Sequence, residues 1–266
     1  LVLMRRLFTW RQIPKMLEIK NMLTEYVKTN TELSETEKGD ILCECDLIMS
    51  FLCYNDIAAM SRLHRSASKL MSKSAVSIRT YGSWTFGSPS VLMMFHREKG
   101  NLQNELDAMN ESMPYYYKVT EGHGQGAELL MQAEAYFMQG DIIKAYIELE
   151  KARQRVKENG QINMDLCCDF LALRLSLHTD KVKLFDFDKR KTETFNTHNT
   201  LFVNIYQSIL AYYFALMGET DKIPDEFREH KLDGINYLAP CKPMMYLIEN
   251  QVYLIQNEFA KVIGRS

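Results

Sequence analysis

The chain has 266 residues, 46% of them hydrophobic and 25% charged, and this ordinary globular balance excludes a disordered, collagen-like or disulfide-stapled protein. Its formal net charge of −2 excludes the generally basic surface with which proteins bind a nucleic-acid backbone. Only 6 prolines are present, and none stands between Pro114 and Pro224, which favours long helices over strands and turns. The sequence therefore predicts a soluble, all-α protein.

The first ten residues carry Arg5 and Arg6 in their middle, which argues against a signal peptide. No apolar run reaches the roughly 20 residues that a transmembrane helix needs. The six cysteines show no zinc-binding or disulfide spacing, so we interpret them as buried, reduced thiols of a cytoplasmic protein. Because the chain begins without Met and residues 259–266 resemble an incomplete helix, we expect a fragment of a larger protein.

From Arg11 onward the apolar pattern predicts pairs of helices, and in the second half these pairs repeat every 39 residues. Each copy predicts a first helix, a residue that ends it, an acidic residue and a second helix. The residues that end the first helices are Gly140, Thr179, Gly218 and Asn257. An alanine stands seven residues before three of these positions, at Ala133, Ala172 and Ala211, with Asn250 as the exception.

Each residue type that recurs in this repeat has a structural reason. The alanine allows close approach of the partner helix, and the large residue that follows three positions later lies on the same face. The pattern predicts a tetratricopeptide-like α-solenoid, a right-handed superhelix of about seven helical hairpins that forms a single domain over residues 1–266. Its clearest copy is residues 126–158. Residues 81–90 interrupt the pattern as an irregular, aromatic connection, and residues 189–194 suggest a polar loop tip or helix edge.

Several motifs are too specific for a generic helical repeat. They are residues 54–57 (YNDI), 60–64 (MSRLH), 82–92 (GSWTFGSPSVL), 113–117 (MPYYY) and 122–124 (GHG). Together they resemble the helical-repeat region of large LuxR-type bacterial transcriptional regulators of the MalT-like class. The resemblance covers residues 40–160 through these motifs and the remainder only through the repeat pattern.

The resemblance implies a modular regulator with an N-terminal ATPase, helical repeats that receive an inducer or partner, and a C-terminal DNA-binding helix-turn-helix. This chain contains no GxxxxGK[ST] phosphate loop. It also shows no compact, basic three-helix segment after residue 200 that is typical of a DNA reader. The resemblance therefore assigns ATP and DNA to modules outside this chain.

The richest aromatic and polar cluster surrounds the irregular connection. Aromatic rings on the concave face of a solenoid stack on sugars, peptides or apolar side chains. The alternative is that Trp84 and Phe86 simply pack a long loop onto the neighbouring hairpin. Residues 122–126 (GHGQG) precede a predicted helix, whose free backbone N–H groups could bind an anion. The favoured interpretation is that they form a turn between repeats. The candidate effector- or partner-binding residues are Tyr81, Trp84, Phe86, His96, Arg97, Tyr116, His123, Glu134 and Phe137.

The six histidines are scattered, and neither an HExxH nor a GxSxG motif is present, so we expect no enzyme, catalytic residue, metal or cofactor in this chain. Our first hypothesis is the sensor and scaffold segment of a cytoplasmic LuxR-type regulator. A small effector or a protein partner would bind in the groove, without a membrane. The alternative is a freestanding tetratricopeptide scaffold for protein–protein interaction.

Overall fold

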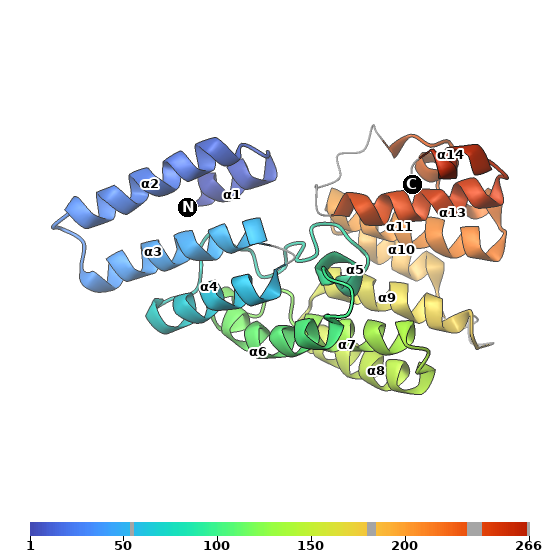
Figure 1. The fold of residues 1–266 in the computed structure, drawn as a ribbon, viewed down its shortest axis with the longest axis horizontal. Helices are drawn as coiled ribbons and strands as arrows, with labels where there is room; N and C mark the ends of the chain where they lie inside the picture. Colours follow the sequence, from blue (N-terminus) through green and yellow to red (C-terminus); the bar gives the residue numbers. More distant parts are fainter. Residues whose placement is uncertain (54–55, 180–184, 233–240, 265–266) are drawn as a thin grey trace. The chain divides into compact units, whose positions relative to one another are not determined.

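The computed structural model describes residues 1–53, 56–179, 185–232 and 241–264, and over these residues the chain forms helices joined by loops, without a strand (Figure 1). The prediction of an all-α protein is therefore confirmed. Tyr54 and Asn55 of the YNDI motif lie outside the described residues. The chain forms two compact units, of which unit 1 comprises residues 1–82 and 95–128 and unit 2 comprises residues 83–94 and 129–266.

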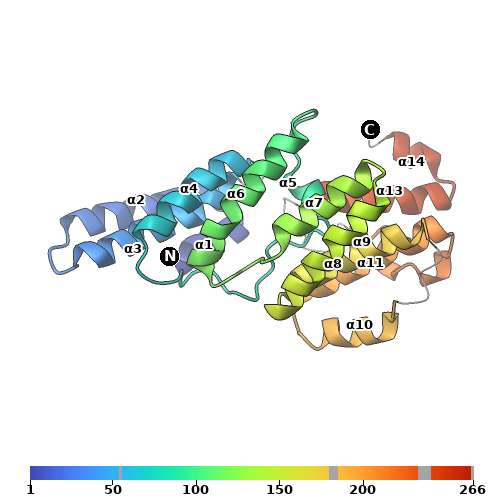
Figure 2. The same cartoon turned by 90° about the horizontal axis from the view of Figure 1, so that it is seen from below.

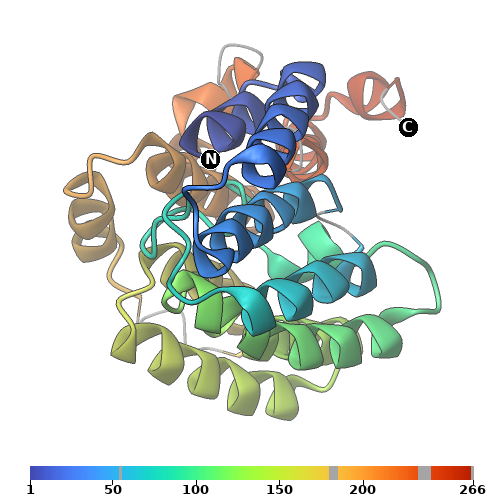
Figure 3. The same ribbon diagram turned by 90° about the vertical axis from the view of Figure 1, so that its left-hand side faces the viewer.

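Unit 1 is a succession of helices in which each packs against the next. They are α1 (Val2–Thr9), α2 (Ile13–Thr29), α3 (Glu35–Met49), the 3-10 turn η1 (Ser50–Cys53), α4 (Ile57–Leu70) and α6 (Leu102–Thr120). Figures 2 and 3 show these neighbours lying side by side along the unit. Ser34 begins α3 with a capping box shared with Glu37, and Asp56 caps α4 through the N–H of Ala59.

Unit 2 contains the helices of the 39-residue repeat. They are α7 (Ala127–Met138), α8 (Ile142–Glu158), α9 (Ile162–Ser176), α10 (Phe187–Phe195), α11 (Thr200–Met217), η3 (Thr220–Lys222), α12 (Asp225–Arg228), α13 (Lys242–Ile255) and α14 (Phe259–Ile263). The repeat positions Gly140, Thr179, Gly218 and Asn257 each follow the end of α7, α9, α11 or α13. Gly218 is the left-handed C-cap of α11, at φ 75°, which a glycine adopts without steric cost.

The core of unit 2 lies between α9, α11 and α13. Helix α9 packs against α8 and α11, and α11 packs in turn against α10 and α13. Of the three alanines of the predicted repeat, Ala133 and Ala211 are fully buried, whereas Ala172 is only half-buried. Among the described helices, α11 is long and apolar enough to cross a membrane by length and composition. Its aromatic and aliphatic side chains instead contribute to this core, as in the central helix of a soluble protein.

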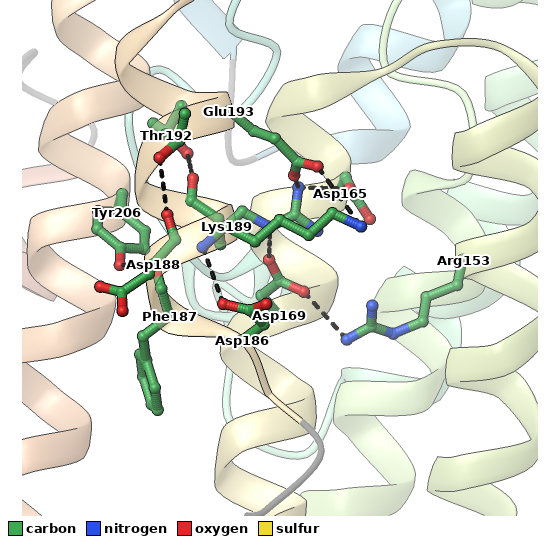
Figure 4. A network of polar contacts seen from close by, with 12 residues as sticks. Arg153, Asp165, Asp169, Asp186, Phe187, Asp188, Lys189, Thr192, Glu193 and Tyr206 are labelled. Atoms are coloured by element: carbon green, nitrogen blue, oxygen red, sulfur yellow. Dashed lines mark hydrogen bonds and ion pairs between the residues drawn. The ribbon is translucent and has the colours of Figure 1, made fainter.

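A polar network joins the helices α8, α9 and α10 (Figure 4). The guanidinium of Arg190 lies 2.7 Å from Asp165 and 2.6 Å from Asp169, and Arg153 lies 3.1 Å from Asp169. Burial raises the pKa of Asp169 to about 6, while the two arginines oppose this shift. Residues 189–194 therefore belong to helix α10 rather than to a loop tip, and Arg190 turns inward to a pair of acids.

Candidate functional site

The nine residues singled out from the sequence are divided between the two units. Tyr81, His96, Arg97, Tyr116 and His123 belong to unit 1. Trp84, Phe86, Glu134 and Phe137 belong to unit 2. The two groups differ in burial and in the residues that they contact.

His96 and Arg97 lie near an open polar pocket of about 550 Å³ in unit 1. The pocket is lined by the first turns of α4 and α6 and by Arg97 and Glu98. His96 Nδ1 lies 2.5 Å from Glu105, and the guanidinium of Arg97 lies 3.0 Å from Asp56. These side chains pair with one another across the pocket. Tyr81 is 66% exposed and stands on the irregular connection.

Tyr116 and His123 are buried in unit 1. The hydroxyl of Tyr116 lies 2.7 Å from His123 Nδ1, and Nε2 of the same ring lies 3.3 Å from the carbonyl oxygen of Gly82. A ring nitrogen that faces a carbonyl must carry the proton, so Nε2 donates and Nδ1 accepts from the tyrosine. Burial lowers the pKa of His123 to about 3, which keeps the ring neutral.

The GHGQG motif is a tight turn that positions His123. Gly122, Gly124 and Gly126 have φ values of 83°, 74° and 98°, in the left-handed region that favours glycine. A Cβ on Gly122 would stand 2.8 Å from the side chain of Gln125. The N–H of Gly126 donates to the hydroxyl of Tyr117 at 3.2 Å. This amide therefore already has a hydrogen-bond partner within the protein.

A second buried histidine in unit 1 was not indicated by the sequence. Nε2 of His64 lies 3.0 Å from the hydroxyl of Ser50, which itself donates to the carbonyl oxygen of Leu47 at 2.6 Å. Burial lowers the pKa of His64 to about 4. The serine hydroxyl therefore gives its proton to the backbone and accepts from the imidazole, the reverse of the proton transfer that would activate a nucleophile.

The most extensive polar site of unit 2 surrounds residues 83–92, which we call the strap. The strap forms no regular helix until α5 (Val91–Phe95) begins at its end, yet most of its residues are buried. Trp84 is 7% exposed and Thr85 and Ser90 are fully buried. A buried stretch of this kind must satisfy its backbone hydrogen bonds without a regular ladder.

Asn163, near the start of α9, holds the first part of the strap. Its Oδ1 accepts from the backbone N–H of Trp84 at 2.6 Å and from that of Thr85 at 3.0 Å. Its Nδ2 donates to the hydroxyl of Thr85 at 3.1 Å. One buried amide side chain thus satisfies two consecutive backbone donors and a side chain.

Glu134 of α7 holds the second part of the strap. Its carboxylate accepts from the hydroxyl of Ser90 at 2.6 Å and from the backbone N–H of Leu92 at 2.8 Å. Glu134 is fully buried, and burial raises its pKa. The guanidinium of Arg174 lies 3.8 Å from the carboxylate and is placed over the ring of Phe137 at 4.5 Å.

The middle of the strap forms a turn. The hydroxyl of Thr85 donates to the carbonyl oxygen of Ser88 at 2.7 Å, and the thiol of Cys167 on α9 lies 3.5 Å from the same oxygen. Gly87 has a φ of 96°, and a Cβ built on it would lie 3.8 Å from Leu201 on α11 and from Cys241, the N-cap residue of α13. The strap therefore meets α7, α9 and α11 and the start of α13.

No protein-family model, curated protein or solved structure matches this chain. Among the described residues, no group of three or more His, Cys, Asp or Glu is arranged to hold a metal ion. The functional conclusion therefore depends on the geometry of the strap and on the motifs noted in the sequence.

Three residues of the strap site, Asn163, Cys167 and Arg174, were not among the sequence candidates. All three lie on α9, whose residues are almost entirely buried. The available signal was the presence of amide, thiol and guanidinium groups within a strongly apolar helical run. Such groups need partners when they are buried, but the sequence does not say that the partners of Asn163 and Cys167 lie almost 80 residues earlier and that of Arg174 lies 40 residues earlier.

Proposed function

We propose that the chain is a tetratricopeptide-like scaffold that receives a protein partner or a small effector on the first helices of its repeats. The observation that carries this proposal is the strap, a buried, turn-containing segment held by side chains from α7 and α9. Solenoids bind their ligands along the inner helices of successive repeats, and the contacts of the strap with α7 and α9 support such a role for these helices.

The chemistry of the strap site suits a polypeptide ligand. Asn163 and Glu134 accept from backbone N–H groups, which every residue except proline offers. The apolar core beside them accommodates aromatic and aliphatic side chains such as those of Trp84 and Leu92. Backbone recognition with a few side-chain pockets is the common way in which domains bind extended peptides.

The motifs at residues 82–92, 113–117 and 122–124 support the setting of a LuxR-type regulator. In that setting the chain acts in the cytoplasm as the sensor and scaffold segment, and it performs no catalysis. Binding would change the stacking of the repeats or the docking of neighbouring modules. Such coupling requires a ligand with different affinities for the resting and active arrangements.

A thermal-shift series tests the ligand-receiving role. Peptides, oligosaccharides and nucleotides are added at increasing concentration to the wild-type chain and to Glu134→Gln. A ligand at 100 times its Kd stabilises the folded state by about 2.7 kcal/mol, which corresponds to a rise in Tm of several degrees. We expect peptides to produce this rise in the wild type and a smaller rise in the variant. Glu150→Gln, at an exposed position on α8, is the matched control. Stabilisation by none of the three classes would overturn the proposal.

The sequence of the intact reading frame tests the regulatory setting separately. The regulator hypothesis expects a phosphate-loop ATPase upstream and a helix-turn-helix downstream of these 266 residues. A reading frame without both modules would favour the freestanding interaction scaffold, and partner binding would then be its whole function.

A further inference from the structure

The strap has an unusual place in the chain. It belongs to unit 2, but the residues before and after it, up to Gly82 and from Phe95, belong to unit 1. Its hydrogen bonds to unit 2 come from side chains of Glu134, Asn163 and Cys167. Unit 2 therefore holds the strap as it would hold a separate peptide.

We propose that the strap is an exchangeable occupant of this site and that the incoming ligand is an uncharged, turn-forming segment of a partner protein. This inference rests on the proposed function and names its ligand class. The incoming segment would carry an aromatic residue, a small turn residue and a hydroxyl residue in the order that the strap has them.

The charges around the site determine the chemistry of the ligand. Residues 83–94 contain no charged side chain. Glu134 is fully buried and has Arg174 as its ionic partner at 3.8 Å. An acidic ligand side chain at the position of Ser90 would face Glu134 at close range without water, and a basic one would compete with Arg174. An uncharged donor such as a serine hydroxyl satisfies the carboxylate without either conflict.

The geometry of the turn determines the spacing of the ligand. Asn163 holds Trp84 and Thr85, and Glu134 holds Ser90 and Leu92. Between them Gly87 adopts a left-handed φ of 96°. A competing segment therefore needs a glycine two residues after the donor bound to Asn163 and a hydroxyl residue three positions beyond that glycine.

Covalent attachment gives the strap an advantage over a free peptide. A tethered segment competes at an effective concentration in the millimolar range. A free ligand of equal intrinsic affinity then binds with a much weaker apparent affinity, because the strap has left the site in only a small fraction of the molecules. Weakening the strap alone should raise the affinity for a peptide added in trans, whereas weakening the site should lower it.

Peptide binding to strap variants tests this exchange. The probe is a fluorescein-labelled peptide with the sequence of residues 80–95, and its binding to the full chain is followed by fluorescence anisotropy. Thr85→Ala with Ser90→Ala removes strap hydrogen bonds and should increase the affinity about tenfold or more, because each bond is worth roughly a fewfold to tenfold change. Addition of Asn163→Ala to this variant should abolish the increase. Asn110→Ala, at an exposed position in unit 1, should leave it unchanged. A folded strap variant that binds the peptide no more tightly than the wild type would overturn the proposal.

A second measurement does not depend on the folding of strap variants. The chain has 2 tryptophans, and Trp10 is 59% exposed, so Trp10→Phe leaves Trp84 as the sole reporter. An unlabelled peptide in which the tryptophan is replaced by phenylalanine should displace the strap and shift the Trp84 emission to longer wavelength in a saturable manner. No shift at millimolar peptide would refute the exchange. Stabilisation by ligands in the thermal-shift series without this shift would leave the proposed function standing while refuting the exchange.

Discussion

Acidification from pH 7 to pH 5 should destabilise unit 1 through two buried histidines. His64 lies against Ser50 and the ring of Tyr116, and His123 lies between Tyr116 and the carbonyl oxygen of Gly82. Burial lowers their pKa values to about 4 and about 3, with Arg5 adding to the shift of His123. Both rings are therefore neutral in the folded chain at pH 5.

The magnitude follows from the difference between the folded and unfolded pKa values. An unfolded histidine has a pKa of about 6.5 and binds a proton as the pH falls to 5. The unfolded state then binds more protons than the folded state, so the free energy of unfolding decreases with falling pH. At pH 5 each histidine lowers the free energy of unfolding by about 2 kcal/mol, because this pH lies about 1.5 units below the unfolded pKa and each unit is worth about 1.4 kcal/mol. Together the two histidines lower the free energy of unfolding by about 4 kcal/mol, which is a large share of the stability of an ordinary domain.

Guanidinium unfolding followed by far-UV circular dichroism measures this effect at pH 7, 6 and 5. His64→Asn and His123→Asn each lower the stability at pH 7, but they should also reduce its pH dependence. His198→Asn is the control, because His198 is exposed and already has a positive φ that asparagine tolerates. An unchanged pH dependence in the double variant of His64 and His123 would refute this reasoning.

Three further substitutions test the packing of the polar groups. Asn163→Ala should lower the free energy of unfolding by about 2–4 kcal/mol, because two backbone donors lose their acceptor. Chemical unfolding followed by Trp fluorescence measures this loss, and a loss below about 0.5 kcal/mol would contradict the prediction. Arg190→Ala should lower the free energy of unfolding by about 3 kcal/mol, because Asp165 loses its ion pair with Arg190 and buried Asp169 keeps only Arg153, whereas the exposed neighbour Lys191→Ala should cost almost nothing in the same titration. Gly122→Ala should lower the Tm by several degrees, because an alanine there would have a left-handed φ and a close contact with the side chain of Gln125. An unchanged melting curve would argue against the turn at residues 122–126.

The ends of several helices were readable from the sequence because their signals are local. Gly218 predicts the end of α11 through its conformational freedom, and Ala133 and Ala211 predict close helix contacts through their size. Of the two alternatives for residues 189–194, the structure shows the helix edge, and four of the six residues are exposed as a run of charged and hydroxyl residues predicts. The inward, half-buried position of Arg190 was not predicted, because its partners Asp165 and Asp169 lie more than 20 residues earlier in the chain.

The candidate site was readable only in part. Trp84, Phe86 and Glu134 were singled out for aromatic character and helix-face spacing, and the structure places all three in unit 2. The role of Asn163 depends on a contact with residues almost 80 positions earlier, which no local pattern encodes. Tyr116 and His123 appeared as surface candidates from their polar atoms, but the structure buries both and pairs them with each other.

Amide hydrogen exchange of the strap, measured residue by residue by NMR in the native chain, tests the central claim most directly. The amides of Trp84, Thr85 and Leu92 should exchange at least about a hundredfold more slowly than in an unstructured peptide, because Asn163 and Glu134 accept their hydrogen bonds. Asn163→Ala should remove the protection of Trp84 and Thr85 and retain that of Leu92. Exchange of all three wild-type amides at unstructured rates would contradict the claim that unit 2 holds the strap as a bound segment.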